Sequence, residues 1–135
     1  MAQTDSIDTN LIVHYLIGDS PKQYKVTDKL LSSPGAQHFI SDLAISECVY
    51  VLEKIYRMSR ETIADLMFFF LTRYSGVVIC NNELISIAMP LYLAHPKLSW
   101  NDCALAAEAE VRHHEPLFTF DKKLVQQLPQ AKLLD

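Results

Sequence analysis

Residues 6–18 read SIDTNLIVHYLIG, and they place an acidic residue between a strand and a helix. A short strand is predicted to end near Ile7 and Asp8. A helix is predicted over about residues 10–17, and Gly18 provides a left-handed cap at its end. The same order, a strand followed by an acidic residue and a helix, recurs along the chain, and the fold is predicted from this repetition.

The alternation of strands and helices continues along the chain. Further strands are predicted over residues 37–40, 77–80, 116–120 and 132–134. The helices between them are predicted over residues 21–32, 42–56, 60–74, 82–95 and 101–113, with a short one from Lys122. Pro90 is expected to kink the helix that contains it. Elements that alternate in this way predict an α/β domain with a mostly parallel central sheet.

The composition fits one globular domain over residues 1–135. Half of the residues are hydrophobic, and the net charge of −4 argues against a general nucleic-acid coat. This charge does not exclude RNA as a substrate, because a local basic face and a bound metal can attract phosphate. The three cysteines form no C-x-x-C pair, which fits a reducing cytoplasm better than a disulfide framework. The start, MAQTDSIDTN, lacks the features of a signal peptide, and no membrane span is expected.

Four acidic residues occupy strand ends or first helical turns. Asp8 and Asp121 directly follow predicted strands, while Glu47 and Asp102 lie early in predicted helices. In a parallel sheet these places share one edge, beyond the carboxyl ends of the strands. Carboxylates crowded there repel one another unless a cation neutralises them, and Mg²⁺ prefers such oxygen ligands. The pattern therefore predicts a metal site formed by these four side chains.

Each of these acids also has a purely structural interpretation. Asp8 and Asp121 suit the N-caps of the helices that follow them. The helix dipole favours Asp102 in a first turn, and Glu47 points away from the apolar stripe of its helix, as a solvated charge would. The helix NDCALAAEAE around Asp102 is apolar nearly all round. We therefore expect that helix to be mostly buried and Asp102 to need a partner.

Four segments of the chain resemble a PIN-domain nuclease, and in particular the toxin of a VapBC-type toxin–antitoxin pair. The segments are IDTNLIVHYL, ISECVYVLEK, LSWNDCALAAEAE and LFTFDKKL, in this order across the chain. The resemblance implies a three-layer α/β/α domain with a central, mostly parallel sheet of about four or five strands. It also implies a ribonuclease that depends on Mg²⁺ or Mn²⁺ and cleaves RNA phosphodiester bonds.

The resemblance assigns residues to the site. The acidic quartet that holds the metal and carries catalysis matches Asp8, Glu47, Asp102 and Asp121. Asp5 is a local alternative to the first acid, but it lacks the Thr-Asn pair that follows Asp8. Asn10 matches the polar residue after the first acid, and Thr119 matches the hydroxyl before the last. Both are expected to orient groups in the site.

Two further features point to partners. Candidate RNA contacts form two basic groups, Lys22, Lys25 and Lys29 in one and Lys54, Arg57 and Arg60 in the other. Solvated helix faces explain both groups equally well. The run LMFFFL at residues 66–71 is apolar on every side of its helix, so either neighbouring helices cover it or it forms a patch for a partner. With the resemblance, this predicts a homodimer that binds a VapB-like antitoxin.

Two other functions fit parts of the pattern. A receiver-like signalling domain is also a small α/β domain, but it requires a phospho-accepting aspartate after its central strand. This chain has Cys80, Asn81 and Asn82 after its third predicted strand. A PIN fold that binds RNA without cutting it is the other alternative, and the intact acids count against it.

Overall fold

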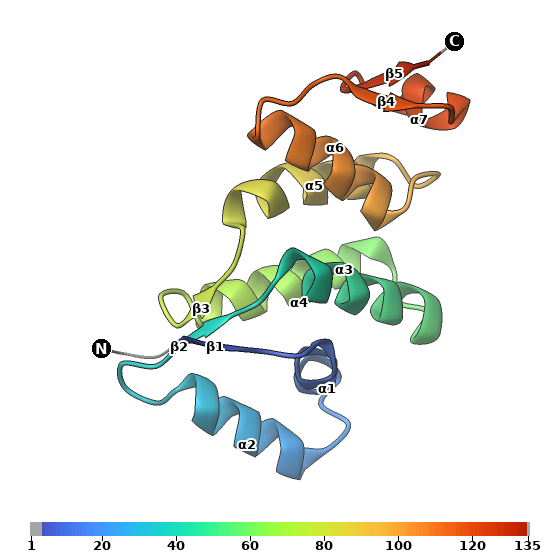
Figure 1. The fold of residues 1–135 in the computed structure, drawn as a ribbon. Helices are drawn as coiled ribbons and strands as arrows, with labels where there is room; N and C mark the ends of the chain where they lie inside the picture. The colour runs from blue at the N-terminus through green and yellow to red at the C-terminus, as the bar shows by residue number, and fades with distance from the viewer. Residues whose placement is uncertain (1–3, 135) are drawn as a thin grey trace. The chain divides into compact units, whose positions relative to one another are not determined.

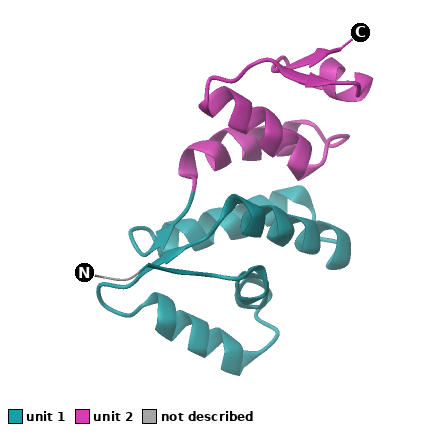
Figure 2. Ribbon diagram, viewed as in Figure 1, with its two compact units in different colours: residues 1–80 teal, residues 81–135 magenta. Residues whose placement is uncertain are grey.

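The computed structural model describes residues 4–134 and divides the chain into two compact units (Figure 2). Unit 1 covers Met1–Cys80, and unit 2 covers Asn81–Asp135. Both units combine helices with parallel strands. The predicted α/β class with parallel strands is therefore confirmed. No helix among the described residues has the length and apolar character needed to cross a membrane.

Unit 1 is built on a three-stranded parallel sheet in the order β1-β2-β3. Its strands are β1 (Thr4–Ser6), β2 (Gln37–Phe39) and β3 (Val78–Ile79). Its helices are α1 (Thr9–Ile17), α2 (Pro21–Leu31), α3 (Asp42–Tyr50), the π-helix η1 (Val51–Ile55) and α4 (Arg60–Arg73). Figure 1 shows α2 on one side of this sheet and α3 with α4 on the other. Unit 1 by itself thus has the order helix, sheet, helix.

The starts of these helices follow from capping side chains. The Ser20 hydroxyl accepts a hydrogen bond from the Gln23 amide, with proline at the first position of α2. Ser41 and Ser59 cap α3 and α4 in the same way. Gly18 ends α1 at φ 68°, a conformation that favours glycine. The helix predicted over residues 42–56 is present, but its second half, Val51–Ile55, is the π-helix η1 and not a continuation of the α-helix.

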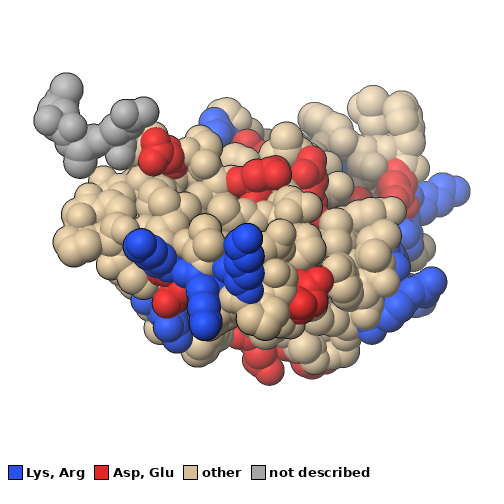
Figure 3. All heavy atoms as spheres, turned by 90° about the horizontal axis from the view of Figure 1, so that it is seen from below, with Lys and Arg blue, Asp and Glu red and all other residues tan. Residues whose placement is uncertain are grey.

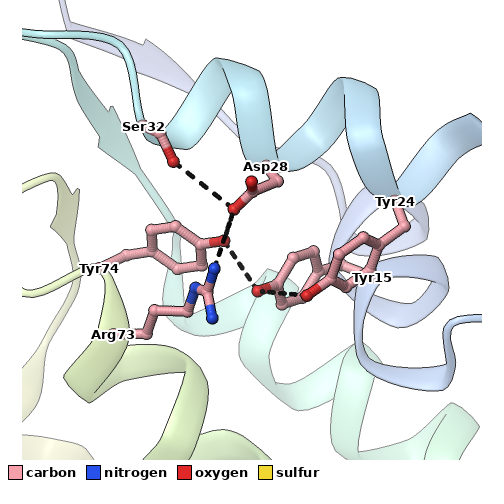
Figure 4. A network of polar contacts seen from close by, with 6 residues as sticks. All are labelled: Tyr15, Tyr24, Asp28, Ser32, Arg73 and Tyr74. Carbon is pink, nitrogen blue, oxygen red and sulfur yellow. Dashed lines mark hydrogen bonds and ion pairs between the residues drawn. The ribbon is translucent and has the colours of Figure 1, made fainter.

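A polar network fixes α2 against α1 and the end of α4 (Figure 4). The Tyr74 hydroxyl donates to Asp28 Oδ1 at 2.7 Å and lies 2.7 Å from the Tyr15 hydroxyl. Arg73 also reaches Asp28, at 3.4 Å. The ring of Tyr24 stacks on that of Tyr15, with centroids 4.7 Å apart. The hydrogen bond from Tyr74 keeps the pKa of Asp28 below its usual value, so this carboxylate stays ionised at neutral pH.

Unit 2 pairs two helices and adds a small βαβ element. It contains α5 (Asn82–Ala94), α6 (Trp100–Val111), β4 (Leu117–Thr119), α7 (Lys122–Gln127) and β5 (Ala131–Leu133). The strands β4 and β5 are parallel neighbours. Tyr92 of α5 meets Trp100 of α6 edge to face, with centroids 5.6 Å apart. Pro90 lies inside α5, as predicted.

The prediction that α6 is mostly buried was only partly correct. Trp100, Cys103 and Ala106 are buried, but Leu105 is 53% exposed and Asp102 is half-buried. An apolar helix of alanines presents little surface, so a single leucine on its outer side does not require a covering layer. Single exposed leucines are common in globular proteins.

The middle strand of unit 1 contains an unusual buried histidine. His38 on β2 is 3% exposed, and neither ring nitrogen has a hydrogen-bond partner among residues 4–134. Asp5 Oδ2 lies 4.0 Å from its Nδ1, beyond hydrogen-bond range. Both nitrogens therefore lose their water contacts on folding without replacing them.

Replacing His38 by leucine is expected to raise the free energy of unfolding by about 1 kcal/mol, because it removes unsatisfied polar atoms from the interior. Urea denaturation of the full chain measures this change. Gln37→Leu on the same strand is the matched control, since Gln37 is exposed. A His38→Leu variant less stable than the parent chain would show that the ring nitrogens are satisfied in solution.

Candidate active site

Asp8 and Glu47 line one hollow of about 330 Å³ in unit 1. Asp8 lies between β1 and α1, and Glu47 lies on α3, the helix that follows β2. Because β1 and β2 are parallel neighbours, their carboxyl ends lead to the same edge of the sheet. The predicted meeting of these two acids therefore occurs within this unit. The hollow is also lined by Thr9, Asn10, His14 and Tyr56.

The carboxylate of Asp8 is available for a ligand. Asp8 is the N-cap residue of α1 and has the extended backbone expected there, but its side chain makes no capping hydrogen bond. The side chain is exposed at the mouth of the hollow. The structural interpretation of Asp8 as a capping side chain was therefore wrong. Its position at the cap leaves both carboxylate oxygens for a cation.

Thr9 orients Glu47. The Thr9 hydroxyl lies 3.0 Å from Glu47 Oε2 and 3.3 Å from the carbonyl oxygen of Ala44, and it donates toward both. Thr9 itself is buried, so this contact is held in a fixed place between α1 and α3. Sequence reasoning assigned the orienting role to the neighbouring Asn10, which is exposed and lines the hollow. In the sequence, the feature that could have pointed to Thr9 as the orienting residue is its hydroxyl, directly after Asp8.

Replacing Thr9 by valine is expected to lower the cleavage rate proposed below by ~10–100-fold, as loss of a group that orients a metal ligand typically does. Valine keeps the shape of threonine but cannot hold Glu47. Thr9→Ser should restore most of the rate, because serine keeps the hydroxyl. Equal rates for the valine and serine variants would contradict an orienting role.

Asp102 takes part in the cap of α6 in unit 2. Its Oδ2 accepts the Ser99 amide at 3.1 Å, while the Ser99 hydroxyl accepts the Asp102 amide at 3.1 Å. This reciprocal arrangement is a capping box, which stabilises the start of the helix. The partner that Asp102 was expected to need is therefore its own helix start. The box uses one carboxylate oxygen and fixes the direction of the other.

Asp121 caps α7 and is positioned by Thr119. Asp121 Oδ1 accepts the amides of Lys123 at 2.9 Å and Leu124 at 3.4 Å. The Thr119 hydroxyl accepts the Asp121 amide at 2.9 Å. The hydroxyl thus contacts the backbone of the last acid. The capping bonds use only Oδ1, so Oδ2 of Asp121 keeps its acceptor capacity.

The family of this chain follows from a comparison with models of known protein families. The PIN domain family model matches residues 6–127, which include all four predicted acids. The chain belongs to the PIN-domain family. PIN domains are generally nucleases, and the four acids of this chain all lie within the matched domain. The match to the PIN family also rules out the alternative that this chain is a receiver-like signalling domain.

Comparisons with individual proteins add little to the family assignment. Among solved structures, the chain is similar to a toxin–antitoxin complex from Klebsiella pneumoniae, with 21% sequence identity and a TM-score of 0.34. That alignment covers 95% of each chain. The search of curated proteins found no match.

The PIN chain brings Asp8 and Glu47 together, and it places Asp102 and Asp121 in unit 2. In the part of the chain that the structure describes, no three histidine, cysteine or carboxylate side chains gather into a group that could hold a metal ion. The four-carboxylate site remains a prediction. The structure supports one half of such a site in unit 1, where the carboxylates of Asp8 and Glu47 line one hollow; we call these two residues the half-site.

The residues of this half-site fit Mg²⁺ or Mn²⁺. Asp8 and Glu47 supply carboxylate oxygens, and the Asn10 amide adds a neutral oxygen at the same hollow. Mg²⁺ keeps several waters and is usually held by one or two protein carboxylates. The residues that line this hollow include no cysteine, which favours a hard cation over a soft one.

The basic residues predicted to contact RNA differ in their surroundings. Lys22, Lys25 and Lys29 are exposed along α2. Arg60 is only 16% exposed and bonds Glu53 at 2.9 Å, and Lys54 lies 3.8 Å from the same carboxylate. Figure 3 shows Lys and Arg side chains in separate groups with acidic side chains among them. The positive charge of α2 is thus more available to phosphate than that of Arg60.

Proposed function

We propose that this PIN-domain protein is a metal-dependent ribonuclease that hydrolyses RNA phosphodiester bonds. In this proposal Asp8, Glu47, Asp102 and Asp121 hold Mg²⁺ or Mn²⁺. The observation that carries the proposal is the hollow in which Asp8 presents a carboxylate unused by capping beside a Glu47 fixed by Thr9. Family membership supports a nuclease, and the hard oxygen donors support the choice of metal.

The proposed chemistry assigns separate tasks to the residues. When bound, the metal supplies Lewis-acid chemistry and activates water toward a phosphodiester. In unit 1, Asp8 and Glu47 would bind the metal, and the hydrogen bond from Thr9 holds the Glu47 carboxylate in place. Thr119 fixes the backbone of Asp121, and the capping box fixes Asp102. Asn10, at the mouth of the hollow, is proposed to orient the substrate phosphate.

A cleavage assay tests the proposal directly. The purified full chain is incubated with a pool of single-stranded RNAs in Mg²⁺, in Mn²⁺ and with a chelator. Cleavage in either metal and none with the chelator supports a metal-dependent ribonuclease. Binding of RNA without cleavage in both metals would favour the alternative, a PIN domain that binds RNA without cutting it.

We also propose that this nuclease is the toxin of a toxin–antitoxin pair and acts in the cytoplasm. The resemblance of its segments to VapBC-type toxins supports this proposal, as do exposed aromatic residues on α4. Phe70 is buried, but Phe68 is 74% and Phe69 53% exposed. Large exposed aromatics are typical of partner surfaces. An antitoxin arginine is suited to the acidic site, where its guanidinium would compete with metal.

A homodimer is expected at micromolar concentration, with Phe68 contributing to the interface. Light scattering on the purified chain measures the mass. Phe68→Glu is expected to shift the mass toward the monomer, because a charge cannot be buried unpaired between subunits. Val26→Glu, at a similarly exposed apolar position on α2, is the matched control. A parent chain that is monomeric throughout the range would contradict the dimer.

A further inference from the structure

A second hollow adjoins the candidate active site. It has a volume of about 420 Å³ and lies between α1 and α2. Asn10 and His14 line both hollows, so the two share a wall on the exposed face of α1. A chain that leaves the acidic hollow across this wall enters the second one. The volume suits a small-molecule-sized group such as one nucleotide.

His14 stands in this shared wall in a fixed orientation. Its Nδ1 lies 3.0 Å from Asp19 Oδ1, in the loop between α1 and α2. That hydrogen bond is the main reason that the pKa of Asp19 lies below its usual value, so the carboxylate partner is ionised at neutral pH. An ionised partner at Nδ1 fixes the ring and leaves Nε2 as the ring atom for a ligand.

The second hollow combines a cation with neutral polar and apolar groups. Lys22 lines it and supplies the positive charge, while Gln23 offers both a donor and an acceptor. Leu11 and Val26 form apolar parts of the wall. This combination matches a nucleotide, whose phosphate needs a cation and whose base has an apolar face and a polar edge.

The shape of this hollow is set by the network behind it. Tyr15 of α1 and Tyr24 of α2 stack, and their hydroxyls connect through Tyr74 to Asp28. These contacts fix the separation of α1 and α2. A preformed hollow binds a ligand without first ordering its walls, which favours affinity.

We propose that the hollow between α1 and α2 is a subsite for one nucleotide of the RNA strand next to the scissile phosphate. Lys22 contacts a phosphate, His14 guides the backbone across the shared wall, and Gln23 meets the base edge. The proposal rests on the proposed ribonuclease function and adds its substrate path. RNA is favoured over a protein segment because the hollow adjoins the acidic one at Asn10 and His14 and contains a lysine with no acidic partner in residues 4–134.

The test measures RNA binding apart from cleavage. Fluorescence anisotropy follows a labelled single-stranded RNA of random sequence, with Ca²⁺ in place of Mg²⁺, at several salt concentrations. Three full-length variants are compared with the parent chain. Lys22→Ala removes the proposed phosphate contact, Gln23→Trp fills the hollow without changing charge, and Lys97→Ala removes an exposed lysine that lines neither hollow and has no proposed role in RNA binding.

Lys22→Ala is expected to lower the dependence of log K on log salt by about 0.7, the value for one single-strand phosphate contact. Gln23→Trp is expected to weaken binding by ~10-fold, equivalent to about 1.4 kcal/mol, because the indole ring occupies the space proposed for the nucleotide. Lys97→Ala should change neither quantity beyond error. Equal effects of the two lysine variants together with unchanged binding by Gln23→Trp would overturn the subsite, and would leave the hollow to a protein partner. Cleavage of RNA by the parent chain in Mg²⁺ is scored separately, so a failed nuclease and a failed subsite give different results.

Discussion

Asp8→Asn is expected to lower the rate of Mg²⁺-dependent RNA cleavage by at least ~10²-fold while the fold stays intact. Asparagine keeps the size of the side chain but loses the charge that binds a divalent cation, and with it the activated water. The Asp8 side chain makes no capping bond, so its replacement removes nothing from α1. Initial rates at saturating metal measure the effect, and thermal melting without metal checks the fold.

Asp65→Asn is the matched control for this substitution. Asp65 is an exposed acid on α4 and does not line the acidic hollow. Its replacement makes the same change in net charge and should leave the cleavage rate within error. An Asp8→Asn variant that keeps nearly the parental rate in Mg²⁺ would mean that the assigned metal ligand is wrong.

Asp102→Asn extends the test to unit 2. The asparagine side chain still offers an oxygen to the Ser99 amide, so the capping box survives in part. A loss of cleavage comparable to that of Asp8→Asn therefore points to a lost ligand and not to a damaged helix. Normal activity of this variant would remove Asp102 from the proposed quartet while leaving Asp8 in place.

Phe70→Ala is expected to lower the free energy of unfolding by about 3–5 kcal/mol, the range for deletion of a fully buried aromatic side chain. Phe70 is 0% exposed. Its ring meets Tyr15 and Tyr74 edge to face, with centroids 5.5 and 5.4 Å away. The substitution therefore leaves a cavity next to the network that fixes α2. Urea denaturation monitored by circular dichroism measures the change.

Phe68→Ala provides the comparison for Phe70→Ala. Phe68 is two positions away on the same helix and is 74% exposed in the single chain, so its loss should change the stability of the monomer by less than about 0.5 kcal/mol, measured at a dilution where light scattering shows a monomer. If the two alanine variants lost equal stability at that dilution, Phe68 would have to be covered within one chain.

Much of the local structure followed from the sequence. Gly18 predicted the end of α1, because the left-handed backbone at a helix end favours glycine whatever packs around it. The approach of Asp8 to Glu47 also followed, because neighbouring parallel strands direct their carboxyl ends to one edge. The change from α-helix to π-helix at Val51 did not follow, since it changes no apolar pattern.

The roles of individual side chains depended on the tertiary structure. The family resemblance suggested Asn10 as the orienting residue, whereas the rotation of α1 against α3 directs Thr9 to Glu47, 38 positions away. The run of three phenylalanines is equally apolar at every position. Only the packing of α4 makes Phe70 a core residue and leaves Phe68 exposed. The sequence by itself thus determined the order of elements and the chemistry of the acids, because these depend on local bonding and residue type. The tertiary structure decided which side chains meet and which are buried, because those depend on contacts between residues far apart in the chain.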